Sequence, residues 1–182
     1  MFQGFEKLYL PFEKCTEKEK ISAANLMAFP EAVTPELYDS IFYSCELSLS
    51  GICKTKTDFI IGAFLARVLP GYQLILLENI SVNPTLKSRS YGRDIINYLG
   101  EKGLSFYGEN FKGIVSPIKC DKKKKSTDHK NAFLLRSMIN SGGSIIVEGA
   151  RAKNNHLHFI YFPYNGGSDN EEIQEVFKKI YS

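Results

Sequence analysis

A short segment rich in serine and basic residues precedes an expected helix. It consists of Lys87, Ser88, Arg89, Ser90, Tyr91, Gly92 and Arg93. The N–H groups in the first turn of a helix have no intrahelical partner, so they can bind a phosphate where the neighbouring side chains are small or polar. The serines and the glycine meet this condition, and the three cations complement a diphosphate. The alternative is an ordinary helix start that a serine caps, with its cations in water.

A strand and a helix are expected to position this segment. The run 72–82 is rich in branched and aromatic residues and ends at the Asn-Pro pair 83–84, which is typical of a strand followed by a turn. After Ser90, apolar residues recur at the spacing of a helix. We expect that helix to end near Gly100 or Gly103, since glycine is a common helix terminator.

Other helices and strands are expected along the rest of the chain. Thr16 and Glu19 have capping-box spacing, which predicts a helix at 16–29, and Thr34 followed by proline predicts a second one. Further helices are expected from Asp128 to Gly142 and from Ser168 onward, and strands at 5–12, 50–57, 58–69, 112–118, 143–149 and 155–164. The lysine-rich run 50–57 is expected at the sheet edge. This order of elements builds an α+β or α/β layered domain.

The composition is that of an ordinary globular protein. The chain has 182 residues, 43% of them hydrophobic, which predicts a single domain over 1–182. Its net charge of +3 is too weak to predict a nucleic-acid partner by itself. The four cysteines form no C-x-x-C pair, so we expect reduced thiols in a cytoplasmic protein.

No signal peptide or membrane-spanning run is expected. His156 and His158 have no further metal ligand at a recognisable spacing, so no metal site is predicted.

The segment 87–92 resembles the acyl-CoA motif of the GNAT (Gcn5-related) N-acetyltransferases, which is a strand, then Q/R-x-x-G-x-G/A, then a helix. Lysine stands at the Q/R position, and Ser90 replaces the first glycine. Val82 followed two residues later by proline matches the usual lead-in. The resemblance covers roughly residues 16 to 164. It implies an α+β, GNAT-like fold with a mixed, mostly antiparallel central sheet flanked by helices, to which this chain adds a C-terminal helix.

The resemblance also implies a function and its binding residues. The chain is expected to be an acetyl-CoA-dependent N-acetyltransferase that passes the acetyl group directly to an amine of a small molecule or of a protein or peptide. The pantetheine arm of coenzyme A would bind backbone groups around Ser81 and Val82, and residues 87–92 would hold the pyrophosphate. Asn131 lies eleven residues before Gly142, as in a family pattern for the later helix.

Deprotonation of the amine calls for a carboxylate, or a water held by one, near the middle of the sheet. Glu78 shares strand parity with Ile80 and Val82 and is the expected base, although a bulge would alter that parity. The alternative is an ordinary strand-end carboxylate. The family often uses a tyrosine as general acid, and Met138 stands in its place.

The general acid is therefore open from sequence. It could be Tyr107, Tyr161 or His129, and solvent protonation of the thiolate is the remaining possibility.

Two other functions stay open from the sequence. The missing tyrosine and the serine at the first glycine position favour a catalytically inactive CoA-binding or sensor module. The lysine run 122–125 and the Gly-x-x-Gly segment 100–103 suggest nucleic-acid binding only weakly, because Glu101 is acidic where a phosphate contact needs a basic residue. The terminal helix and the final hairpin could form a homodimer interface. The acceptor amine is not determined by any of these patterns.

Overall fold

The computed structural model of the protein describes residues 6–28, 31–86, 91–120, 129–152, 155–164 and 170–181. Its helices are α1 (Glu17–Ala28), α2 (Pro35–Ser44), α3 (Tyr91–Tyr107), α4 (His129–Asn140) and α5 (Asn170–Tyr181), with 3-10 helices at Phe12–Lys14, Pro70–Tyr72 and Gly108–Asn110. Its strands are β1 (Lys7–Pro11), β2 (Gly51–Thr55), β3 (Ile60–Leu69), β4 (Leu74–Val82), β5 (Gly113–Cys120), β6 (Ser144–Ala152) and β7 (Asn155–Pro163).

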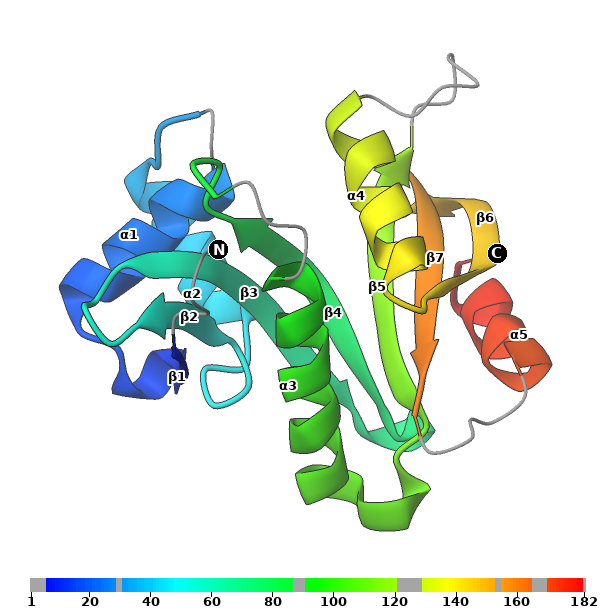
Figure 1. The fold of residues 1–182 in the computed structure, drawn as a ribbon. Helices are drawn as coiled ribbons and strands as arrows, with labels where there is room; N and C mark the ends of the chain where they lie inside the picture. Colours follow the sequence, from blue (N-terminus) through cyan, green and yellow to red (C-terminus); the bar gives the residue numbers. More distant parts are fainter. Residues whose placement is uncertain are drawn as a thin grey trace. The chain divides into compact units, whose positions relative to one another are not determined.

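The strands form one mixed sheet in the order β1-β2-β3-β4-β5-β7-β6 (Figure 1). Strands β4 and β5 pair in parallel, and the pairs β1–β2, β2–β3, β5–β7 and β6–β7 are antiparallel. The predicted mixed, mostly antiparallel sheet with flanking helices and an additional C-terminal helix is confirmed. The chain forms two compact units, Met1–Val68 with Leu77–Leu99, and Leu69–Leu76 with Gly100–Ser182.

Helices α1 and α2 of the first unit begin where their capping residues predict. In α1, the Thr16 N–H donates to the Glu19 carboxylate at 2.8 Å, and the Glu19 N–H donates to the Thr16 hydroxyl at 3.3 Å. In α2, the Leu37 N–H donates to the Thr34 hydroxyl at 3.2 Å. Both helices pack on β2 and β3 through a buried cluster. Its members are Phe12, Ala23, Ala24, Ile41, Ile52, Ala63 and Leu65.

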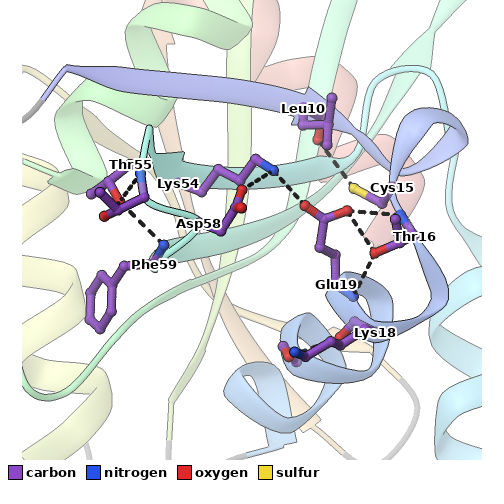
Figure 2. Close-up of polar contacts among 11 residues, drawn as sticks. Leu10, Cys15, Thr16, Lys18, Glu19, Lys54, Thr55, Asp58 and Phe59 are labelled. Carbon is purple, nitrogen blue, oxygen red and sulfur yellow. Dashed lines mark hydrogen bonds and ion pairs between the residues drawn. The ribbon is translucent and has the colours of Figure 1, made fainter.

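A polar cluster ties α1 to β2 (Figure 2). The Lys54 ammonium donates to Glu19 at 2.6 Å and to Asp58 at 2.8 Å. The side chains of Lys54 and Glu19 are only 15% and 17% exposed. Hydrogen bonding to Lys54 lowers the pKa of Glu19, and hydrogen bonding to Asp58 and Glu19 raises the pKa of Lys54. Both groups are therefore charged at neutral pH, and their pairing fixes the first turn of α1 on the sheet.

Strand β2 is not an edge strand, so the prediction for 50–57 is wrong. Leu8 pairs with Lys54 and Tyr9 with Cys53, so β1 covers the side of β2 that faces away from β3. Lysines alternate in this strand because Lys54 binds carboxylates and Lys56 follows the strand end, where it pairs with Glu6. Alternating lysines are therefore compatible with an inner strand when acidic partners are available.

Helix α3 continues through Gly100 and Gly103 to Tyr107, so the prediction that it ends at either glycine is wrong. A methyl group on Gly100 would lie 2.6 Å from the Tyr164 ring, and one on Gly103 would lie 2.2 Å from the Phe111 ring. Both glycines are required by close packing in the second unit, and neither terminates the helix. In the first unit, α3 packs on the sheet through Tyr98, which stacks on Tyr9 with ring centroids 4.5 Å apart.

The second unit places helices on both faces of β5 and β7. Helix α5 buries Ile173 and Phe177, and the Phe177 ring lies 5.0 Å from that of Phe159. Gly143, which follows α4, lies against Ile160 and Phe162, whose side chains point to the opposite face from Phe159. Strand β4 enters this unit through Leu74–Leu76, paired in parallel with Gly113–Val115. No helix in the described part of the chain is long and apolar enough to span a membrane.

Candidate functional site

The first turn of α3 contains Tyr91, Gly92 and Arg93, three residues of the predicted diphosphate segment. Arg93 is exposed. A methyl group on Gly92 would meet its nearest described atom, the Ile80 side chain, at 3.8 Å, which is an ordinary contact. Packing among the described residues therefore does not require glycine at this position. Lys87, Ser88, Arg89 and Ser90 lie outside the described residues.

Lys7 is a further cation near this turn that the sequence reasoning missed. Its ammonium pairs with Asp94 and lies 4.9 Å from the centre of the Tyr91 ring. Asp94 is in the first turn of α3, where its carboxylate complements the helix dipole. Lys7 reaches it from β1, which is 87 positions away in the sequence. No local pattern could have predicted this contact.

The predicted pantetheine-binding residues, Ser81 and Val82, end β4 next to β3. A β-bulge in β3 precedes this point, since the register shifts between Cys53↔Gly62 and Lys54↔Ile60. A methyl group on Gly62 would lie 2.9 Å from the Ser81 carbonyl oxygen. The glycine thus allows β3 to approach β4 closely. The Asn83 N–H then donates to the Ile61 carbonyl at 2.8 Å and fixes the chain just beyond β4.

Glu78, the predicted base, lies in β4 beside Arg67 of β3. The Arg67 Nε lies 2.8 Å from the Glu78 Oε1 in an ion pair, and the two side chains are 49% and 29% exposed. The Glu78 Oε2 bonds no residue in the described part of the chain. This oxygen is therefore the one that could take a proton from a bound amine.

Glu78 and Ile80 are two residues apart in β4, but their neighbours belong to different elements. Arg67 shares the parity of Ala63 and Leu65, which pack against α1 and α2, so Glu78 faces those helices. Ile80 instead lies next to Gly92 of α3. Glu78 and Ile80 therefore do not follow the alternation of a regular strand, a change that one extra residue in a strand produces.

Three cysteines of the first unit are unsuited to nucleophilic chemistry at neutral pH. Burial raises the pKa of both Cys15 and Cys53 to about 11. Burial also raises the pKa of Cys45, and the negative charge of Glu78 contributes to that shift. The thiolate is the nucleophilic form of cysteine. None of these three thiols is therefore suited to form an acyl-enzyme.

In the second unit, the structure limits the choice of a general acid. Met138 is 3% exposed, in the place where the family often has tyrosine. Tyr161 is fully buried, and its hydroxyl donates to the Lys112 carbonyl at 2.7 Å, so its proton is already committed. The Tyr107 ring lies over Phe111 with centroids 6.2 Å apart, and its hydroxyl oxygen is buried. The side chains of His129 and Asn131 lie outside the described ones.

His156 and His158 share a face of β7 and both bond to Gly149 of β6. The His158 Nδ1 accepts the Gly149 N–H at 3.3 Å, and the His156 Nδ1 lies 3.2 Å from the Gly149 carbonyl oxygen. Gly149 has a φ of +64° within an irregular stretch of β6. The two rings thus stabilise this bulge. No group of three or more metal-ligating side chains is found among the described residues.

Comparisons with known proteins identify the fold. No family model matches the chain, and no curated protein matches its sequence. Among solved structures, the chain resembles the NatC complex bound to Gag peptide and CoA, with a TM-score of 0.61 and 13% identity over 88% of this chain and 99% of that one. It also resembles a protein from Desulfovibrio desulfuricans that is assigned to the GNAT family of acetyltransferases, with a TM-score of 0.60 and 12% identity over 88% and 99% of the two chains.

A third similar structure is diaminobutyrate acetyltransferase from Paenibacillus lautus in complex with L-2,4-diaminobutyric acid and coenzyme A. Its TM-score is 0.56 at 12% identity, over 89% of this chain and 98% of that one. The three alignments include nearly the whole of each solved chain. The protein described here therefore has the GNAT fold.

Proposed function

We propose that the protein is an acetyl-CoA-dependent N-acetyltransferase of the GNAT superfamily. The observation that carries this proposal is the junction of β4 and α3 within a GNAT fold, where the acyl-CoA motif falls at the start of α3. The neighbouring structures from NatC and Paenibacillus lautus are both complexes with coenzyme A, which supports the same ligand here.

Both backbone groups and side chains are proposed to bind coenzyme A. Backbone groups of Ser81 and Val82 bind the pantetheine arm. The first turn of α3 and the segment before it bind the pyrophosphate. Gly92 supports this assignment, because its lack of a side chain lets a phosphate approach the helix N-terminus. Arg93 is exposed and available to a phosphate oxygen.

The proposed reaction is a direct transfer. The Glu78 Oε2 takes a proton from the acceptor ammonium, either directly or through a water. The free amine attacks the thioester carbonyl carbon, a C–N bond forms, and the C–S bond breaks. The nitrogen releases its second proton to solvent, and coenzyme A leaves as the thiolate and takes a proton from solvent. Direct transfer agrees with the raised pKa values of Cys15, Cys45 and Cys53, since a cysteine intermediate would need an available thiolate.

A CoA-binding module without catalysis is the second candidate. Buried Met138 favours it, because the thioether has no proton to give the leaving thiolate. A coenzyme A thiolate is a good enough leaving group to depart without a general acid, so Met138 does not exclude transfer. Activity measurements separate the two candidates.

Both candidate functions require CoA binding, so a ligand-binding experiment tests them together. Acetyl-CoA or CoA at about 100 times its dissociation constant should stabilise the fold by about 2.7 kcal/mol, and NAD at the same concentration should not. Ser90→Leu, at the position of the family's first glycine, should weaken CoA binding at least about tenfold. Asn97→Leu is the matched control, because it adds the same side chain at an exposed position of α3. The absence of any stabilisation by CoA or acetyl-CoA would exclude both candidates.

Measuring turnover tests only the candidate function in which the protein is an enzyme. Release of the CoA thiol, corrected for hydrolysis, is measured across a panel of amines. Glu78→Gln should lower kcat by about 10²- to 10⁴-fold, the usual contribution of a general base, while CoA affinity stays unchanged. A variant with unaltered kcat would remove Glu78 from the mechanism.

A further inference from the structure

Arg67 has hydrogen-bonding capacity that the fold does not use. Its Nε lies 2.8 Å from the Glu78 Oε1 in an ion pair. A guanidinium has five N–H donors, four of them on the two Nη atoms. Within the described part of the chain no residue bonds those Nη atoms, and the Arg67 side chain is 49% exposed. The two Nη atoms therefore provide a partly exposed planar pair of donors beside the proposed base.

The backbone on either side of Arg67 is held in place. The hydroxyl of Ser50, which is fully buried, accepts the Ala66 N–H and donates to the Ala66 carbonyl, both at 2.9 Å. On the other side, the Val68 N–H donates to the Glu46 carboxylate at 3.0 Å. These bonds fix β3 immediately before and after Arg67. The guanidinium is thus preorganised, which lowers the entropic cost of binding a ligand.

The charges of Arg67 and Glu78 complement a molecule that carries both a negative and a positive group. The free Nη donors of Arg67 match a carboxylate, which a guanidinium binds through two parallel hydrogen bonds. The Glu78 Oε2, attached to the same ion pair, matches an ammonium. Glu46 is the other nearby carboxylate, and the Val68 N–H occupies one of its oxygens. An acceptor with only an amine would leave the outward donors of Arg67 to water.

We propose that Arg67 is a specificity residue that selects acceptors carrying a carboxylate close to the amine to be acetylated. The carboxylate binds the Arg67 Nη atoms while the amine lies at the Glu78 Oε2. This inference rests on the proposed function, since it concerns the acceptor of that reaction. An amino acid and the N-terminus of an acidic peptide share the required chemistry.

The alternative is that Arg67 only joins β3 to β4. An exposed ion pair contributes roughly 0–1 kcal/mol to stability. Its removal would then lower the activity with every acceptor by the same factor. A binding role changes the ratio between acceptors, so that ratio is the decisive measurement.

Two pairs of small amines provide the test, because their members differ only in one carboxylate. The kcat/KM is measured for ornithine against putrescine and for lysine against cadaverine, with acetyl-CoA saturating. Ornithine and lysine should each be preferred at least about tenfold, which corresponds to about 1.4 kcal/mol. The preference should fall as salt is raised, because exposed charges are screened. The peptides Asp-Ala-Ala and Asn-Ala-Ala form a second arm that distinguishes a peptide acceptor from a free amino acid.

Variants then assign the preference to Arg67. Arg67→Gln should bring both ratios to about one, and Arg67→Lys should retain part of the preference, since lysine keeps the charge but loses the planar pair of donors. Lys56→Gln is the control, because it removes an exposed cation elsewhere in the first unit. It should leave the ratios unchanged.

The outcomes separate this inference from the proposed function. Equal kcat/KM values within each pair for the wild type, or an undiminished preference in Arg67→Gln, would overturn the inference and leave the transferase intact. If CoA binds but no amine is acetylated, the transferase proposal fails. Calorimetry of the CoA-loaded protein with ornithine and putrescine then decides the role of Arg67. Tighter binding of ornithine that Arg67→Gln abolishes would support it, and equal binding would refute it.

Discussion

Gly62→Ala should damage the site through the backbone of β4. The new methyl group would lie 2.9 Å from the Ser81 carbonyl oxygen, 3.3 Å from the Ile95 side chain and 3.7 Å from the Val82 Cα. The Ile95 contact can relax by a side-chain rotation. The Ser81 contact cannot, because it involves a strand carbonyl, so β3 and β4 must move apart by a few tenths of an ångström.

The expected loss in the free energy of unfolding is the difference between two effects. Overpacking of this kind typically costs about 1–3 kcal/mol. Replacing a strand glycine by alanine returns about 0.5–1 kcal/mol, because the unfolded chain loses conformational freedom. The net loss is therefore about 1 kcal/mol, which lowers Tm by about 2–4 °C in a chain of this size. The displaced Ser81 and Val82 backbone should also weaken CoA binding, by about tenfold.

Gly71→Ala is the matched control for this variant. Gly71 is in the turn between β3 and β4, and a methyl group there would meet no atom within 4 Å. It should leave CoA affinity unchanged and Tm unchanged or slightly higher. Thermal unfolding and calorimetric titration with CoA measure both quantities. If Gly62→Ala matches Gly71→Ala in stability and in CoA affinity, the close approach of β3 to β4 has no role at this site.

Two further predictions concern stability. Phe177→Ala should lower the free energy of unfolding by about 3–5 kcal/mol, because the side chain is 1% exposed and packs on Phe159; a loss below about 1 kcal/mol in urea denaturation would show that α5 is not docked as described. Lys54→Met should cost about 2 kcal/mol at pH 7, as expected for a hydrogen bond to a charged group. Because the pKa of Glu19 is lowered from 4.5 in the folded state, the stabilisation is present above that pH and is lost as the pH falls through the folded pKa. The difference between wild type and Lys54→Met should shrink in acid, and a difference independent of pH would contradict the assignment.

Patterns among residues close together in the sequence predicted the helices and strands well. The capping box of α1 depends on Thr16 and Glu19, three residues apart, and the cap of α2 on Thr34 and Pro35. Such contacts form within one turn, so the residue types and their spacing contain all the information that they need. The order of helices and strands followed from these signals and led to the correct fold class.

Features that depend on distant contacts were missed. Nothing within 50–57 indicates that β1 covers β2, because the pairing depends on residues about 45 positions earlier. From the sequence, Gly100 and Gly103 resemble helix ends. In the structure, the rings of Tyr164 and Phe111 pack against them. A glycine that ends a helix and a glycine that admits a ring are identical in sequence. Only the packing distinguishes them.

The candidate site was predicted unevenly for the same reason. The resemblance to the acyl-CoA motif depends on the contiguous residues 87–92, so the CoA site could be predicted from them alone, and it stays a prediction. The partners of the proposed catalytic and binding residues are not contiguous with them. Arg67 reaches Glu78 across two neighbouring strands, and Lys7 reaches Asp94 from β1. Neither pair follows from helical or strand periodicity, which concerns only neighbours along one element.

The change of face along β4 explains how one strand could serve both substrates. Glu78 faces the side of α1 and α2, whereas Ile80 faces α3. A regular strand would place the two side chains on one face, so the base would point toward the helix that carries the proposed pyrophosphate site. With this change of face, the carboxylate and Arg67 face the opposite side from Ile80. Under the proposed function, the acceptor would approach the thioester from one face while coenzyme A binds along the other.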